Sequence, residues 1–167
     1  MVNEERLQIE TLWHTCAVRV RRFLRRTMGD SETADDLLGQ TFLEAARSWH
    51  RFTGRGNREA WLFGIARNLS RRAHRSGRLR RTEPLIHEPP ARSEAATEES
   101  SDKLDRMRSA IARLPDKLRE TLTYRLADGM SYDEIAAALG IPVGTVRSRL
   151  HDAVRRLREE LTNTDQE

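Results

Sequence analysis

Apolar residues recur along most of the chain at intervals of three and four, the spacing that places side chains on one face of an α-helix. The pattern predicts a first helix that ends near Gly29, a second that begins at Asp30 or Ser31, and a third that Asn57 caps. The apolar positions of these three stretches are Ile9, Leu12, Trp13, Cys16, Ala17, Val20, Phe23 and Leu24; Ala34, Leu37, Leu38, Thr41, Phe42, Ala45 and Trp49; and Trp61, Leu62, Ile65, Ala66 and Leu69. We expect them to form one helical domain over residues 1–82.

A second group of helices is predicted over residues 103–167. Two short apolar stripes come first, separated by Pro115 and closed by Gly129. Their members are Leu104, Met107, Ile111 and Leu114, then Leu118, Leu122 and Leu126. These two helices would supply the core against which the end of the chain packs.

The stretch from Ser131 to Leu161 has the features of a helix-turn-helix. Ser131 and Glu134 form an S-x-x-E capping box, and Gly140 ends the short helix that follows. The next helix starts after Pro142, and we expect it to bury Val146, Leu150, Ala153, Val154, Leu157 and Leu161. Its other face carries Arg147, Ser148, His151 and Arg155, side chains suited to the DNA major groove. The alternative is an ordinary helical hairpin with a charged outer face.

Charge divides the chain in the same places as the helical pattern. Residues 1–82 have a net charge of +8, residues 83–102 of −5 and residues 103–167 of +1. The middle segment is rich in Pro, Glu, Ser and Ala and shows no periodicity, which predicts a flexible acidic linker. The expected fold class is therefore all-α, with two small helical domains joined by that linker.

The first domain combines a glycine-containing loop with a row of arginines. Gly54 and Gly56 break regular structure between the second and third helices. Between Arg67 and Arg81 the sequence has seven arginines and no acid. A solvated face normally mixes both signs of charge, so this row favours contacts with nucleic-acid phosphates over a merely solvated face.

Several classes of chemistry find no support in the sequence. The single Cys16 excludes an internal disulfide and a cysteine-based zinc cluster, and its apolar position favours a packed thiol. No nucleophile, metal or phosphate motif is found, so we expect neither a catalytic site nor a metal or cofactor. No signal-peptide core and no run of 18 apolar residues occurs, which predicts a cytoplasmic protein without membrane insertion.

The motifs together resemble those of a known family. The segments DDLLGQTFLEA at 35–45, RF at 51–52, AWLFGIARNL at 60–69 and LPDKLRETL to GIPVGTVRSRLHDAVRRLRE resemble bacterial sigma factors of the sigma-70 family. The similarity is strongest to the small two-domain extracytoplasmic function (ECF) group and covers roughly residues 8–82 and 104–161. It implies a sigma region 2 domain at 1–82, a linker at 83–102 and a sigma region 4 domain at 103–167.

The resemblance also implies partners and site residues. The first domain would bind the polymerase clamp and the minus-10 promoter strand, the second the polymerase flap and the minus-35 element, and an anti-sigma factor is an expected partner. The clamp contacts would be Asp35, Asp36, Leu37, Gln40 and Phe42. The minus-10 contacts would be Gly54, Arg55, Gly56, Asn57, Arg67, Asn68, Arg71 and Arg72. The minus-35 contacts would be Thr145, Arg147, Ser148, Arg149, His151 and Arg155. Thr41 and Asp152 depart from the family pattern, where an acid and a basic residue are usual.

The predicted function is thus recognition of both promoter elements with core RNA polymerase, and promotion of DNA opening, without enzymatic chemistry. The main alternative is a free-standing helix-turn-helix regulator with a helical dimerisation domain. That alternative leaves the glycine-containing loop and arginine row without a role. An RNA-modifying enzyme ranks last because no catalytic constellation is found.

Overall fold

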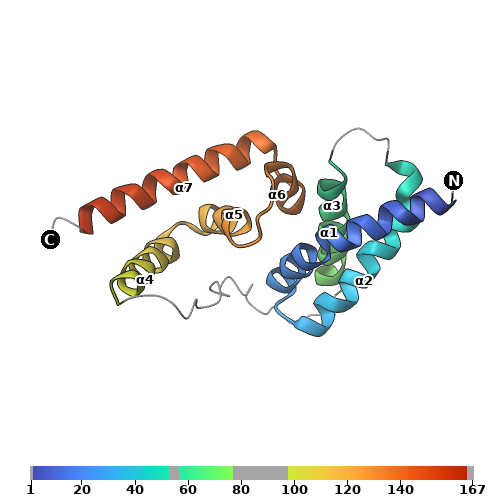
Figure 1. The fold of residues 1–167 in the computed structure, drawn as a ribbon, viewed down its shortest axis with the longest axis horizontal. Helices are drawn as coiled ribbons and strands as arrows, with labels where there is room; N and C mark the ends of the chain where they lie inside the picture. Colours follow the sequence, from blue (N-terminus) through green and yellow to red (C-terminus); the bar gives the residue numbers. More distant parts are fainter. Residues whose placement is uncertain (1, 53–56, 77–97, 165–167) are drawn as a thin grey trace.

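The computed structural model describes residues 2–52, 57–76 and 98–164, and within these ranges the chain is helical, without a β-strand (Figure 1). The first group contains α1 (Val2–Met28), α2 (Ser31–Ser48), the 3-10 turn η1 (Trp49–Arg51) and α3 (Arg58–Arg75). The second contains α4 (Glu98–Arg113), α5 (Asp116–Leu126), α6 (Tyr132–Leu139) and α7 (Val143–Thr164). The all-α prediction is confirmed. Helix α4 begins inside the stretch that we assigned to the linker, and the remainder of that stretch lies outside the described residues.

Capping side chains set the starts of three helices where the sequence predicts them. Asp30 accepts a hydrogen bond from the Thr33 amide at 2.7 Å and starts α2. The Asn57 side chain accepts from the Glu59 and Ala60 amides in the first turn of α3. Ser131 and Glu134 form the reciprocal capping box at the start of α6. Each contact pairs a backbone amide that the helix itself leaves unsatisfied.

The core of the first group is built from α1, α2 and α3. Its buried members include Leu12, Cys16, Val20 and Leu24 from α1, six residues of α2, and Leu62, Phe63 and Ala66 from α3. Phe63 was not among the expected core positions, although it is fully buried and stacks edge-on against Phe23, with ring centroids 5.9 Å apart. Conversely, Trp13 lies 43% exposed at the border of the α1 stripe.

The second group packs α5, α6 and α7 around a smaller core. Leu122, Ile135, Val146, Leu150 and Leu157 are buried there. Four positions expected to be buried are substantially exposed instead, namely Leu104, Met107, Leu126 and Val154. The exposed ones lie at the edges or the outer ends of their helices, where the apolar stripe extends past its packing partner.

Candidate nucleic-acid interface

Helices α6 and α7 form the predicted helix-turn-helix. Gly140 ends α6 in the left-handed conformation, with φ of +66°, and its amide donates to the Ala136 carbonyl at 2.8 Å. The Pro142 carbonyl then accepts the amides of Thr145 and Val146 at the start of α7. Val146 and Leu150 anchor α7 to the core, so the opposite side of this helix faces outward.

Four of the six predicted minus-35 residues share that outward side of α7. Arg147, Ser148, His151 and Arg155 are exposed, whereas Thr145 and Arg149 are half-buried. The Ser148 hydroxyl donates to the Thr145 carbonyl at 3.1 Å, so it is engaged with its own helix in the free chain. The four exposed groups form a surface that can enter a major groove without a change in the backbone.

Acidic neighbours modulate the charge of this surface. Arg155 pairs with Glu159 at 3.2 Å and lies 3.8 Å from Asp152. The imidazole of His151 also lies 3.8 Å from the Asp152 carboxylate. Asp152, one of the departures from the family pattern, therefore places a carboxylate near both of these side chains within the chain itself.

The predicted minus-10 residues divide into two parts. Arg67, Asn68, Arg71 and Arg72 lie on α3, and the last three are exposed. Arg67 is half-buried, since its guanidinium lies against Gly140 of the second group. The side-chain oxygen of Asn57 is engaged in capping α3. Gly54, Arg55 and Gly56 lie outside the described residues.

The predicted clamp residues occupy two sides of α2. Asp35, Asp36 and Gln40 are exposed and form an acidic surface near the start of the helix. Leu37 and Phe42 are buried in the core, and Trp13 covers Phe42 with ring centroids 4.7 Å apart. The two apolar residues therefore hold α2 in place, and their side chains are not part of the accessible surface.

Asp35 already has a partner within the first group. Both of its carboxylate oxygens accept from the Arg21 guanidinium, at 2.5 and 2.7 Å. This hydrogen-bonded pair lowers the pKa of Asp35 below its usual range. The carboxylate is thus ionised and oriented before any partner arrives.

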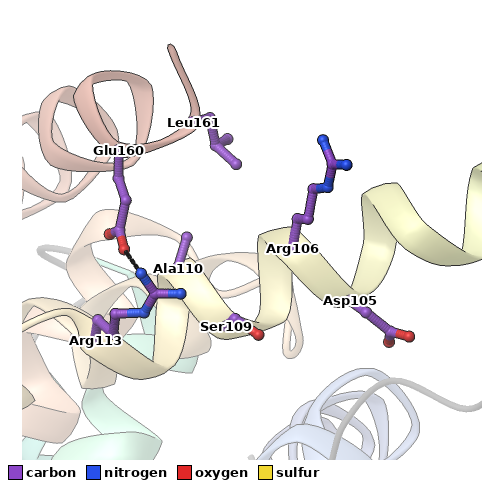
Figure 2. Close-up of a pocket in the computed structure, with 7 residues that line it drawn as sticks. All are labelled: Asp105, Arg106, Ser109, Ala110, Arg113, Glu160 and Leu161. Atoms are coloured by element: carbon purple, nitrogen blue, oxygen red, sulfur yellow. Dashed lines mark hydrogen bonds and ion pairs between the residues drawn. The ribbon is translucent and has the colours of Figure 1, made fainter. Parts of the chain in front are cut away.

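A hollow lies between α4 and the end of α7, and the predicted minus-35 residues are not among those that line it (Figure 2). Arg113 and Glu160 line the hollow and form an ion pair of 2.5 Å, and Leu161 and Ala110 add apolar side chains to the lining. The exposed Leu104 and Met107 belong to the same helix, α4. Mixed polar and apolar lining of this kind suits a protein surface better than a small metabolite.

Sequence reasoning missed two features of the first group. Trp49, Phe52 and Trp61 form a cluster of half-buried rings with centroids 5.5 to 5.7 Å apart, beside the predicted capture loop. One face of α1 also contacts the second group through Arg19 and Arg26. The aromatic signal was present as an RF dipeptide between two tryptophans, but nothing local indicates a contact across more than 100 residues.

Other classes of site find little support in the structure. No group of three or more His, Cys, Asp or Glu side chains that could hold a metal ion occurs among the described residues. Within the same ranges, every helix is too short or too polar to cross a membrane. Cys16 is fully buried, and burial raises the pKa of its thiol, as expected for a packed rather than a reactive cysteine.

Two family models match the chain, one in each group of helices. Residues 12–80 match Sigma-70 region 2, and residues 104–157 match Sigma-70, region 4. Together they cover most of the chain in the order that the sequence motifs indicate. The class of protein is thus a two-domain sigma factor, which favours this interpretation over a free-standing regulator.

Curated relatives narrow the assignment. The chain is 34% identical over 157 residues to the ECF RNA polymerase sigma factor SigL of Mycobacterium tuberculosis, covering 90% of this chain and 86% of SigL. It is 35% identical over 138 residues to the ECF sigma factor EcfG of Rhodopseudomonas palustris, covering 83% and 76%. It is also 32% identical over 148 residues to the sigma factor HrpL of Pseudomonas syringae, covering 85% and 80%. The chain belongs to the sigma-70 family and, within it, to the ECF group.

A solved structure supports the same assignment. The sigma factor RpoE of Bartonella quintana, solved in complex with the anti-sigma factor NepR, is 26% identical and matches with a TM-score of 0.54. The match covers 93% of this chain and 97% of that one. CnrH, solved with the cytosolic domain of CnrY, shares the fold at the same TM-score and 24% identity.

Proposed function

We propose that this chain is an alternative sigma factor that recruits core RNA polymerase to promoters through two separate DNA-binding surfaces. The observation that carries this proposal is the outward face of α7, where four exposed polar side chains follow a capped helix-turn-helix. Arginine at such a position reads guanine by bidentate hydrogen bonds in duplex DNA. The second group would therefore recognise the minus-35 element.

The first group is suited to a different form of DNA. Asn68, Arg71 and Arg72 present two cations and an amide on one side of α3, in its C-terminal half. The rings of Trp49, Phe52 and Trp61 lie at the other end of the helix. Arginines and aromatic rings together suit single-stranded DNA, because arginine contacts phosphates while bases stack on rings. The first group would therefore bind the melted minus-10 strand, with base capture by residues 54–57.

The acidic surface of α2 completes the proposal. Asp35, Asp36 and Gln40 are exposed on α2 and would bind the polymerase clamp. The chain would act without chemistry of its own, in the cytoplasm where its polymerase works. By analogy with RpoE and NepR, an anti-sigma factor would be a further partner.

Run-off transcription tests the proposal directly. Core polymerase with this chain should yield transcripts from genomic promoter fragments that core polymerase alone does not use. Specific transcription without the chain, or none with it, would contradict the proposal. Binding of the isolated chain to a palindromic operator would instead support the free-standing regulator.

Arg147→Ala provides the first specific prediction. If Arg147 pairs with a guanine edge, its loss should cost about 1–3 kcal/mol on the cognate minus-35 element and much less on templates altered at that base. The measurement is transcription from matched templates that differ only in the minus-35 element. Equal losses on every template would show that Arg147 contacts phosphate and does not read sequence.

A further inference from the structure

A line of residues runs along one face of α3 from an aromatic ring to a pair of cations. Its members are Trp61, Gly64, Asn68, Arg71 and Arg75, which follow one another at spacings of three and four and therefore share one face of the helix. Trp61 and Gly64 are half-buried, and the other three are exposed. We call these five residues the α3 line.

Nothing in the described part of the chain explains why residue 64 is a glycine. Glycine inside a helix lowers stability relative to alanine, because it loses more backbone freedom on folding. Gly29, Gly129 and Gly140 adopt positive φ after the ends of α1, α5 and α6, whereas Gly64 lies inside α3 without a positive φ. A Cβ atom added at Gly64 would meet no atom of another described element within 4 Å. Neither backbone conformation nor internal packing therefore requires a glycine here.

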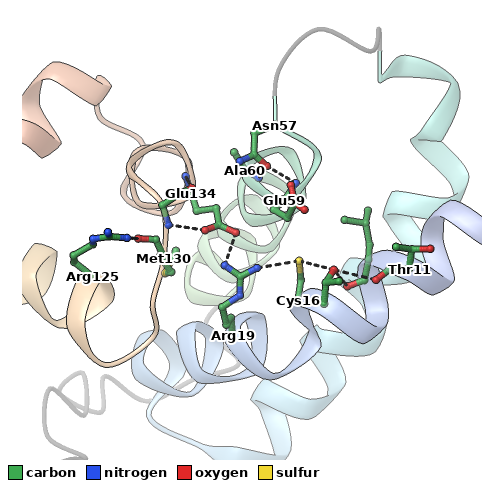
Figure 3. A network of polar contacts seen from close by, with 12 residues as sticks. Thr11, Cys16, Arg19, Asn57, Glu59, Ala60, Arg125, Met130 and Glu134 are labelled. Atoms are coloured by element: carbon green, nitrogen blue, oxygen red, sulfur yellow. Dashed lines mark hydrogen bonds and ion pairs between the residues drawn. The ribbon is translucent and has the colours of Figure 1, made fainter.

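The first end of the α3 line is held in place by the start of the helix. The Asn57 side chain accepts from two amides of the first turn, at 2.8 and 3.2 Å (Figure 3). The Trp61 ring lies edge-on to Trp49, with centroids 5.7 Å apart, and 5.5 Å from the ring centroid of Phe52. This end is thus a fixed group of half-buried rings, the kind of surface on which bases stack.

The second end of the α3 line is cationic. From Ala60 to the end of α3 the sequence has four arginines and no acid. The Arg75 guanidinium donates to the Arg71 carbonyl at 3.4 Å, which holds this side chain along the helix. Arginines without neighbouring acids on their helix suit the phosphates of a nucleic acid.

The second group of helices leaves the middle of the α3 line open. It meets the first group through α3 against α6 and through ion pairs of α1. Arg19 pairs with Glu134 at 2.6 Å (Figure 3), and Arg26 donates to both oxygens of Asp128. No described atom of these helices lies within 4 Å of the Cβ position at Gly64.

We propose that Gly64 is the point at which a bound single strand of DNA crosses α3, with a base on the rings beside Trp61 and phosphates at Arg71 and Arg75. This inference rests on the proposed function and adds Gly64 to it as a positioning residue. Trp61 and Arg71 are about 15 Å apart along the helix axis, and Gly64 lies between them. A side chain at position 64 would hold the strand away from one end of the line. A duplex fits less well, because its bases are paired and cannot stack on the rings.

Binding of a fluorescent single-stranded 20-mer to the full chain at low salt tests this role. Gly64→Ala should weaken binding several-fold, and Gly64→Leu roughly tenfold, about the loss of one stacked base. Urea unfolding of the same variants should move to higher urea concentration, because both residues have a higher helix propensity than glycine. Weaker binding by a more stable protein separates a contact with the strand from damage to the fold.

Gly39→Ala is the matched control. Gly39 also lies inside a helix of the first group, and a Cβ atom there would likewise meet nothing within 4 Å. The exposed acids Asp35 and Asp36 lie one turn before it on α2 and disfavour a phosphate backbone. This variant should gain stability as well, but its affinity for the 20-mer should stay at the parental value.

A duplex of the same sequence provides the second comparison, and its affinity should be nearly the same for the parent and for both Gly64 variants. Parental affinity of Gly64→Leu for the single strand, or an equal loss in Gly39→Ala, would overturn the proposal. So would equal losses on single strand and duplex, or no detectable binding of the 20-mer by the parent chain. None of these measurements uses core polymerase, so a failure of the proposed sigma function would be seen separately, as a lack of run-off transcription.

Discussion

Single residues at helix ends carry two roles in this chain. Glu134 completes a capping box with one oxygen and pairs with Arg19 with the other. Gly140 ends α6 and leaves room for the Arg67 guanidinium. Asn57 caps α3 and lies in the loop predicted to capture a base. Substitutions at such residues change local folding as well as contacts, so each needs a control that separates the two.

Gly140→Ala should destabilise the chain for two reasons. An alanine in the left-handed conformation costs roughly 1–2 kcal/mol, and its Cβ would displace the Arg67 guanidinium. Gly144→Ala is the control, because Gly144 lies in α7 with open space around it and should gain up to about 1 kcal/mol from the higher helix propensity of alanine. Urea unfolding measures both changes, and equal stability of the two variants would contradict the requirement for glycine at 140.

Arg21→Ala should raise the pKa of Asp35 toward its ordinary value. The Arg21 hydrogen bonds and charge lower that pKa in the folded chain. The pair therefore stabilises the fold fully at pH values above the ordinary pKa of aspartate, and this stabilisation is lost as pH falls through the lowered pKa. Carbon-13 NMR titration of the Asp35 carboxyl in both chains measures the shift. An unchanged midpoint would show that the pair does not form in solution.

At the scale of helices, α3 packs against three other helices. It packs on α1 and α2 within its own group and on α6 of the other, so its buried arc is wider than one amphipathic face. Phe63 and Ser70 are buried as a result, although the periodic pattern marks Leu62 and Ala66. The remaining surface of α3 carries the exposed arginines of the proposed strand-binding site.

Asn57→Asp separates the cap of α3 from its predicted DNA contact. Aspartate caps a helix as well as asparagine, so the free energy of unfolding should stay within about 0.5 kcal/mol of the parent, while Asn57→Ala should lose about 1 kcal/mol. The added negative charge should nevertheless reduce promoter opening, measured by permanganate footprinting with holoenzyme. Normal opening by the Asn57→Asp protein would place residue 57 outside the DNA contact.

The sequence predicts the helices of this chain better than their assembly. Helix ends follow from local chemistry, so Asp30, Asn57 and Ser131 could be identified from neighbouring residues. Trp13 and Val154 lie at the edges of their apolar stripes and are exposed. Whether such a residue is buried depends on how far the neighbouring helix extends, and the local sequence pattern holds no information about that. The contacts of Arg19 and Arg26 with the second group could not be predicted, since a row of arginines is expected to face solvent or phosphate rather than another domain.

At the scale of the whole molecule, the two groups of helices meet through charged residues as well as through apolar packing of α3 on α6. Tyr124 and Phe23 contribute the aromatic part of the contact, and buried ion pairs flank it. Such pairs are weak sources of net stability, because the loss of hydration offsets much of the attraction. The ion pairs therefore define the arrangement of the two groups more than they stabilise it.

Arg26→Met and Asp128→Leu test this balance as a double-mutant cycle. Arg26→Met leaves a buried carboxylate without a partner and should cost about 3–5 kcal/mol in the free energy of unfolding at pH 7. The double variant removes both charges and should recover most of that loss, giving a large coupling energy between the two positions.

The pKa of Asp128 gives the pH dependence of the same cycle. Burial raises this pKa even though Arg26 and other arginines lower it, so the folded chain binds the carboxyl proton more tightly than the unfolded chain does. Removing Arg26 should raise the pKa further. The Arg26→Met chain should therefore regain stability relative to the parent as pH falls through the raised value, because protonation removes the unpaired charge. Urea unfolding between pH 7 and pH 4.5 measures this recovery. The double variant, which has no carboxyl at 128, should show no such gain, and a gain of equal size there would assign the effect to another group.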